Sequence, residues 1–262
     1  LGVSVWPGVG KLAIGTTHSL HARTARSRNF PMATDTKETF RWPPLESNPE
    51  VFTDYMRGVG LTAEWAINEL YGFDEDLLGM LPQPVMAVIA NVERLAKADD
   101  RQRGDAALVK PGLFYMKQHE ALDNACGVIA CLHAVYNTAA GATLPAESIL
   151  ARHLATASAL DPAARAAALE ANVEFQSVHK AMASEGQSAM AQSQSDVRHH
   201  FVAFVLVDGN LVELDGTKAG PLIVAEGCTD CLRGAVAAVQ QRLAAGEYSD
   251  RLSMMALCPA MN

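Results

Sequence analysis

Three residues that lie far apart in the chain have side chains that could together cleave an acyl bond. The first is Cys126, which follows polar residues at 123–124 and precedes an apolar run at 128–132, so we expect it in the first turn of a helix. A helix N-terminus carries partial positive charge and unpaired N–H groups, which lower the pKa of a thiol and favour the nucleophilic thiolate. Taken alone, a cysteine at this position is more often a small buried residue that begins a helix than a nucleophile.

A thiolate nucleophile works with a base, and the base needs an orienting group. The segment 199–216, HHFVAFVLVDGNLVELDG, predicts two strands around a tight turn at Asp208-Gly209-Asn210. His200 opens the first strand and Asp215 closes the second, so pairing of the strands would bring these two side chains near each other. The chain order Cys, His, Asp is that of papain-like thiol hydrolases.

Several further blocks surround these residues in a fixed order. They are Gln118, NACG at 124–127, HF at 200–201, ELDG at 213–216, RWPPLESNPEVF at 41–52, YGFDEDLLGMLPQPVMAVI at 71–89 and SEGQ at 184–187. Together they resemble the ubiquitin C-terminal hydrolases, the papain-like family of small deubiquitinases. The matching blocks extend from about residue 40 to about residue 258, which is nearly all of the chain after its first 39 residues.

The resemblance implies an α+β fold, with a central antiparallel β-sheet flanked by α-helices and a knotted backbone. It implies one catalytic domain at 40–262, in which a crossover loop at 184–197 passes over the cleft and restricts access to slender or flexible adducts. The polar composition of 184–197 also predicts a loop.

The same resemblance assigns the roles. Cys126 is expected to be the nucleophile, His200 the base and Asp215 the group that orients His200. Gln118 and the backbone N–H of Cys126 are expected to stabilise the oxyanion. The family usually places this glutamine six residues before the cysteine, whereas here the separation is eight, so we expect a loop to absorb two extra residues.

The implied activity is thiol-dependent hydrolysis of amide, ester or thioester adducts at the C-terminal glycine of ubiquitin, or of a ubiquitin-like relative. It requires no metal or cofactor, and a monomer is the family default. The odd number of cysteines favours a cytosolic or nuclear protein, and we expect a cytoplasmic one. One alternative is a catalytically impaired ubiquitin-binding protein of the same fold, which the shifted Gln118 would favour. Another is a papain-like peptidase of unrelated specificity, which would cleave short peptides without ubiquitin.

Composition agrees with a single large domain in a reducing compartment. The chain has 262 residues, 49% of them hydrophobic, and a net charge of −8, which argues against a nucleic-acid-binding surface. Its five cysteines are an odd number, which favours reduced thiols. No apolar run is long enough to cross a membrane.

Residues 1–31 contain basic residues and no acidic ones. This pattern suits either a transit peptide or upstream sequence translated before a true start at Met32, and we favour the second. We expect 1–39 to be a disordered or non-native extension.

Competing histidines and cysteines are expected to have other roles. Neighbouring strand residues face opposite sides, so only one of His199 and His200 can face Cys126, and the HF match selects His200. Asp208 is expected to form the turn. Surface or packing roles are expected for His119, His133, His153, His179 and Cys131. The Cys228-x-x-Cys231 pair lacks the second ligand pair of a structural zinc site.

Local signals predict the other elements. Helices are expected at 49–57 with an Asn48 cap and Pro49, at 63–70, from Pro145 and from Asp161-Pro162 within 145–183, and at 229–245. Strands are expected at 85–89, 113–116, 222–224 and 253–258, and a solvated helix or loop at 91–107.

Overall fold

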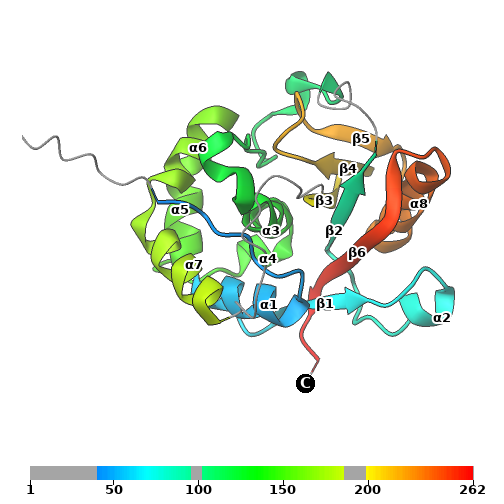
Figure 1. Cartoon of the computed structure of the whole chain (residues 1–262), viewed down its shortest axis with the longest axis horizontal. Helices are drawn as coiled ribbons and strands as arrows, with labels where there is room; N and C mark the ends of the chain where they lie inside the picture. The colour runs from blue at the N-terminus through cyan, green and yellow to red at the C-terminus, as the bar shows by residue number, and fades with distance from the viewer. Residues whose placement is uncertain (1–39, 96–101, 186–198, 262) are drawn as a thin grey trace, which may run out of the picture. The chain divides into compact units, whose positions relative to one another are not determined.

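A single antiparallel sheet forms the centre of the protein (Figure 1). The structure is a computed structural model, and it describes residues 40–95, 102–185 and 199–261. The strands are β1 (Trp65–Leu70), β2 (Ala87–Arg94), β3 (His199–Val207), β4 (Asn210–Leu214), β5 (Leu222–Ala225) and β6 (Tyr248–Pro259). Their order across the sheet is β1-β6-β2-β3-β4-β5, and every neighbouring pair is antiparallel.

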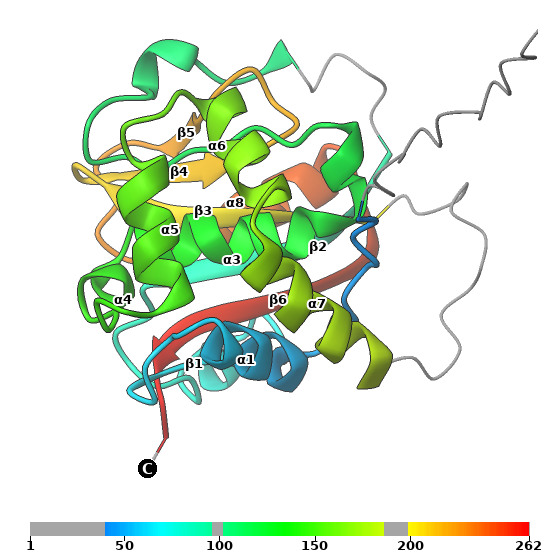
Figure 2. The same ribbon diagram turned by 90° about the vertical axis from the view of Figure 1, so that its left-hand side faces the viewer.

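Helices cover both faces of the sheet. The α-helices are α1 (Pro49–Gly58), α2 (Glu75–Leu78), α3 (Cys126–Tyr136), α4 (Ala139–Ala142), α5 (Ile149–Ala157), α6 (Pro162–Glu170), α7 (Val173–Glu185) and α8 (Cys231–Ala244). Helix α3 lies between the sheet and helices α5, α6 and α7, while α8 packs on the other face (Figure 2). The central antiparallel sheet with flanking helices confirms the predicted fold class. Among the described residues, no helix has the length and apolarity needed to span a lipid bilayer.

Two apolar clusters fill the space on either side of the sheet. The larger one joins α1, α3, α5, α6 and α7 to inward-facing residues such as Ile89, Ala203 and Met255. The other joins α8 to the alternate residues of the same strands, such as Val88 and Phe204. Successive strand residues face opposite sides, so β2, β3 and β6 contribute apolar side chains to both clusters.

Several local predictions are confirmed. Asn48 caps α1, where its Oδ1 accepts a hydrogen bond from Glu50 N at 2.9 Å. Asp161 caps α6 in the same way, accepting from Ala163 N and Ala164 N. At the hairpin turn, Asp208 and Gly209 have φ values of 51° and 74°, the left-handed geometry that tight hairpins require.

The predicted helix at 63–70 is wrong, because Trp65–Leu70 is strand β1. Its six residues pair with β6 from Trp65↔Pro259 to Leu70↔Met254. Thr53 of α1 also accepts a hydrogen bond from Ile67 N and donates one to Ile67 O. Pairing with a long neighbouring strand outweighs local helix propensity here.

Three other predictions need correction. Residues 91–94 belong to β2, so the expected solvated segment 91–107 begins inside the sheet. Residues 113–116 are buried but belong to no strand. Helix α5 begins after its cap Ser148 rather than at Pro145.

Some predictions fall outside the described residues. The N-terminal extension 1–39 and most of the crossover loop lie there. The knotted backbone stays a prediction.

Candidate active site

Cys126 is the first residue of α3, as the sequence predicts. Residues 127–135 of this helix are all buried, so the helix is held on all sides by the core. A 3₁₀-helix, η3 (Glu120–Ala125), runs directly into it. Gly127 follows the cysteine where a side chain would come within 2.7 Å of the Phe52 ring, so the backbone packs closely at this end.

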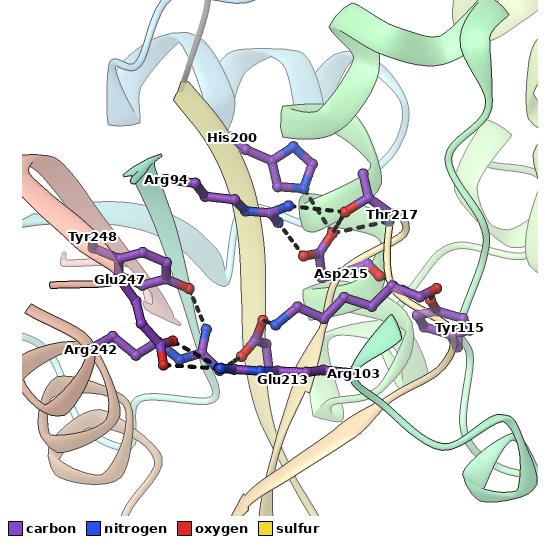
Figure 3. Close-up of polar contacts among 11 residues, drawn as sticks. Arg94, Arg103, Tyr115, His200, Glu213, Asp215, Thr217, Arg242, Glu247 and Tyr248 are labelled. Atoms are coloured by element: carbon purple, nitrogen blue, oxygen red, sulfur yellow. Dashed lines mark hydrogen bonds and ion pairs between the residues drawn. The ribbon is translucent and has the colours of Figure 1, made fainter. Parts of the chain in front are cut away.

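His200 and Asp215 meet Cys126 from the sheet. His200 lies near the start of β3, and Asp215 directly follows β4. His200 Nε2 lies 2.8 Å from Asp215 Oδ1, and the Asp215 side chain is fully buried (Figure 3). Since Nε2 faces the carboxylate, the other ring nitrogen of His200 is left to interact with the Cys126 thiol.

Burial works against charge on all three groups, but their mutual interactions outweigh it. For Cys126, burial alone would raise the pKa; the hydrogen bond and charge of His200, with backbone hydrogen bonds from Phe201 and Gly127, bring the pKa below the ordinary thiol value. Burial would lower the pKa of His200, yet Asp215 and Cys126 raise it to about 9. Both shifts favour the charged pair, a thiolate beside an imidazolium, over the neutral pair.

Gln118 lies beside this group, although its amide is engaged elsewhere. Its Nε2 lies 2.8 Å from Asp123 O and 3.3 Å from Leu122 O, and its Oε1 is buried without a hydrogen-bond partner among the described residues. Its backbone N donates to Gly216 O at 2.9 Å. The stretch between Gln118 and Cys126, where two extra residues are expected, forms η3 rather than an irregular loop, and the Gln118 amide bonds to this short helix.

Residues 113–118, which we call the Gln118 segment, pair with no strand. Side chains of neighbouring helices form hydrogen bonds with several of their backbone groups instead. Met116 N donates to His133 Nε2 at 3.0 Å, and Arg165 Nη1 donates to Tyr115 O at 2.9 Å. Tyr115 stacks on His133 at 5.5 Å, and its hydroxyl lies 2.9 Å from the carbonyl oxygen of Asp215. One buried cluster thus links α3, the Gln118 segment and the Asp215 turn.

Two residues that the sequence does not predict for the site contact the Asp215 carboxylate. Arg94, the last residue of β2, forms an ion pair with Oδ2 through Nη2. Thr217 donates to Oδ1 from its backbone N at 3.0 Å and from its hydroxyl at 2.8 Å. We call Arg94, His200, Asp215 and Thr217 the Asp215 site. Thr217 could have been found from its position two residues after Asp215, whereas nothing local marks Arg94.

A second buried carboxylate lies two residues before Asp215. Lys218 Nζ donates to Glu213 Oε1 at 2.7 Å, and Arg242 of α8 forms an ion pair with Oε2. Arg242 also donates to the Tyr248 hydroxyl (Figure 3). We call Glu213, Lys218, Arg242 and Tyr248 the Glu213 cluster. It closes the turn that presents Asp215, because Lys218 N donates to Asp215 O at 3.0 Å.

The remaining candidates lie apart from the three-residue group. His199 is exposed, Asp208 pairs with Lys110 at the hairpin turn, and Cys131 is fully buried. His133, His153 and His179 are buried packing residues. Over the described parts of the chain, no group of three or more His, Cys, Asp or Glu side chains, including those near the Cys228–Cys231 pair, has a metal-binding arrangement.

Comparison with known proteins defines the class. The model of the family "Ubiquitin carboxyl-terminal hydrolase, family 1" matches residues 42–244. The chain therefore belongs to this family and is a cysteine-type hydrolase.

Individual relatives agree. The chain is 34% identical over 209 residues to a "Probable ubiquitin carboxyl-terminal hydrolase" of Dictyostelium discoideum, covering 77% of this chain and 81% of the relative. It is 36% identical over 188 residues to a "Ubiquitin carboxyl-terminal hydrolase" of Drosophila melanogaster, covering 69% and 81%. The fold is similar to that of the Trichinella spiralis UCH37 catalytic domain bound to ubiquitin vinyl methyl ester, with a TM-score of 0.66 at 24% identity over 84% of this chain and 96% of that one.

Proposed function

We propose that the protein hydrolyses small or flexible adducts from the C-terminal glycine of ubiquitin through a Cys126-His200-Asp215 triad. The observation that carries the proposal is the convergence of these residues, with His200 Nε2 2.8 Å from Asp215 Oδ1 and a lowered pKa at Cys126. Two relatives, at 34% and 36% identity, are named as ubiquitin carboxyl-terminal hydrolases, one of them as a probable one.

In the first half-reaction, the Cys126 thiolate attacks the carbonyl carbon of the C-terminal glycine. The C–S bond forms as the carbonyl electron pair moves to oxygen, and collapse of the tetrahedral intermediate expels the leaving group. The His200 imidazolium protonates that leaving group, so an acyl-enzyme remains beside a neutral imidazole. Asp215 keeps the ring oriented through Nε2.

In the second half-reaction, neutral His200 takes a proton from water, and the resulting hydroxide attacks the thioester carbonyl. The C–S bond breaks and the thiolate–imidazolium pair is restored, while the C-terminal carboxylic acid of ubiquitin releases its proton to the solvent and leaves as a carboxylate. The oxyanion in both halves would be stabilised by Cys126 N–H and by Gln118 Nε2. For Gln118 this requires the amide to exchange its contact with Asp123 O for one with the substrate oxyanion.

Residues 40–262 form the proposed catalytic domain. We propose that its narrow cleft admits the side-chain-free Gly-Gly tail of ubiquitin, and that the acidic protein, with net charge −8, attracts the basic residues of that tail. All five cysteines are free thiols, which agrees with a reducing, cytoplasmic setting.

The test is release of a fluorophore from ubiquitin that carries it as a C-terminal amide. The full chain is expected to turn over, Cys126→Ala to abolish turnover, and Gln118→Ala to lower kcat by roughly 10²–10³-fold. A short fluorogenic peptide without ubiquitin is expected to be cleaved poorly.

The engaged amide of Gln118 favours one other candidate, a catalytically impaired ubiquitin-binding protein. That candidate predicts that the unmutated chain binds ubiquitin without releasing the fluorophore. Such a result would reject the hydrolase.

A further inference from the structure

Asp215 has a cationic partner that takes no part in the proposed reaction. We propose that Arg94 is a positioning residue: it holds the Asp215 carboxylate so that Oδ1 stays directed at His200. This inference rests on the proposed hydrolase function and adds a fourth residue, from a different strand, to its machinery.

The backbone of β2 directs Arg94 toward the site. Within β2, Val92 lies opposite His200 of β3. On the β6 side the pairing shifts register between Val92 and Arg94, from Val92↔Leu252 to Arg94↔Tyr248. Such an irregularity turns the side chains beyond it. It places the Arg94 guanidinium at Asp215 Oδ2, while Nη1 donates to Thr217 Oγ1 at 3.1 Å.

Each carboxylate oxygen of Asp215 has its own partners. Oδ1 accepts from His200 Nε2 at 2.8 Å and from the backbone N and hydroxyl of Thr217. Arg94 occupies Oδ2. The carboxylate is fully buried and the Arg94 side chain is 17% exposed. Without Arg94, the buried Oδ2 would lose its ion-pair partner, and the carboxylate could turn about its Cβ–Cγ bond and exchange the two oxygens.

The positive charge of Arg94 also affects the pKa of His200. Burial lowers and Asp215 raises the pKa of His200, and the positive charge of Arg94 opposes the rise. The charged and titratable groups that act on Asp215 and His200 from the surrounding elements are Arg94, Tyr115, Lys117, Cys126, His133 and Lys218. Removal of Arg94 should therefore raise the pKa of His200 further, a change that a purely structural role would not produce.

The experiment compares Arg94→Met, Arg94→Lys and a control, Arg233→Met, in the full chain. Arg233 forms an ion pair with Glu75 and another with Asp230. Arg94→Met is expected to lower kcat by about 10–100-fold with little change in KM, and to move the alkaline limb of the kcat profile upward by about one pH unit. Arg94→Lys retains the charge, so its alkaline limb should stay in place and its rate should partly recover. Arg233→Met should match the unmutated protein.

Coupling to Asp215 is tested in a double-mutant cycle. In an Asp215→Asn background, Arg94→Met should cost less than threefold, because the carboxylate it positions is gone. Equal losses in the two backgrounds would overturn the proposal. So would an Arg94→Met enzyme with unchanged kcat and alkaline limb. If Arg94→Met does not fold, Arg94→Lys provides the test instead. A shift of the alkaline limb of its kcat profile, although the positive charge is retained, would also overturn the proposal.

A readout without ubiquitin separates this inference from the proposed function. The rate of Cys126 alkylation by iodoacetamide, followed against pH, should rise in two steps, with the upper step at the pKa of His200. That step should move upward in Arg94→Met, and an unmoved step would overturn the Arg94 proposal. If the unmutated chain does not turn over the ubiquitin substrate, the proposed hydrolase function is rejected. The alkylation experiment then still tests whether Arg94 acts on the Asp215–His200 pair.

Discussion

Two buried carboxylates lie two residues apart at the end of β4, and they differ in the kind of partner that neutralises them. In the Glu213 cluster both partners are basic side chains, the ammonium of Lys218 and the guanidinium of Arg242. In the Asp215 site one partner is the guanidinium of Arg94 and the other is the imidazole of His200. Both carboxylates are fully buried, so burial does not distinguish them.

The difference separates a structural role from a chemical one. Removing one member of a buried ion pair leaves an uncompensated charge and strongly destabilises the fold. An imidazole partner adds a group that exchanges a proton near neutral pH. We therefore expect the Glu213 cluster to control stability and the Asp215 site to control activity.

The largest expected effect is on activity. Asp215→Asn should lower kcat by roughly 10³–10⁴-fold, because the amide no longer holds the His200 ring in the required orientation and charge state. The measurement is fluorophore release from the ubiquitin amide, with the folded fraction checked by circular dichroism. A loss of less than tenfold in the kcat of the folded variant would show that Asp215 is not the group that orients His200.

The next effect is on stability. Glu213→Gln keeps the side-chain shape but leaves Lys218 and Arg242 without their carboxylate, so it should lower the free energy of unfolding by about 3–5 kcal/mol. At urea concentrations below the unfolding transition, the kcat of Glu213→Gln should stay within about tenfold of the unmutated value. Urea denaturation measures the first quantity.

The matched control for this prediction is Glu75→Gln, which removes an exposed carboxylate that pairs with Arg233. Because exposed ion pairs contribute little to the free energy of unfolding, the urea midpoint of Glu75→Gln should not differ measurably from that of the unmutated protein. Equal midpoints for Glu213→Gln and Glu75→Gln would contradict the structural role of the Glu213 cluster.

A third effect concerns the pH dependence of stability in Cys126→Ala, where the thiol no longer titrates. In the folded unmutated protein Asp215 and Cys126 raise the pKa of His200 to about 9, against about 6.5 in an unfolded chain. Without Cys126, Asp215 still raises this pKa, to a value below 9. The stabilising contribution of His200 is therefore full below pH 6.5 and is lost as the pH rises toward 9, a decrease of roughly 2–3 kcal/mol. Denaturation at pH 6 and pH 9.5 measures it. Adding Asp215→Asn should remove most of this slope, and a slope that survives would assign it to another group.

The smallest effect on activity is expected from a substitution at Gly216, which directly follows Asp215 and contacts the Gln118 segment. At Gly216 a Cβ would lie 2.9 Å from Gln118 N and 3.1 Å from Met116 O, so Gly216→Ala should push the Gln118 segment away by a few tenths of an ångström. A loss of about tenfold in kcat is expected. Normal kcat in this variant would mean that the Gln118 segment need not be held tightly.

Sequence reasoning worked where a local signal had a single meaning. The Asn48-Pro49 helix start and the Asp208-Gly209 turn each depend on one or two residues with restricted backbone geometry. Chemistry and chain order together predict Cys126, His200 and Asp215 as the catalytic residues, and in the structure His200 interacts with both Asp215 and Cys126.

It failed where long-range contacts decide. Trp65–Leu70 becomes a strand because β6 lies beside it, and 113–116 stays out of the sheet because side chains of α3 and α6 take its backbone groups. Arg94 stands in a stretch rich in charged residues, and no local pattern reveals the register shift that turns it toward Asp215.

The most direct test of the central claim is to treat the full chain with ubiquitin vinyl methyl ester and map the adduct by mass spectrometry. The account predicts one ubiquitin per chain, attached at Cys126, with Cys131, Cys228, Cys231 and Cys258 unmodified. Absence of an adduct, or attachment at any other cysteine, would contradict the assignment of Cys126 as the nucleophile.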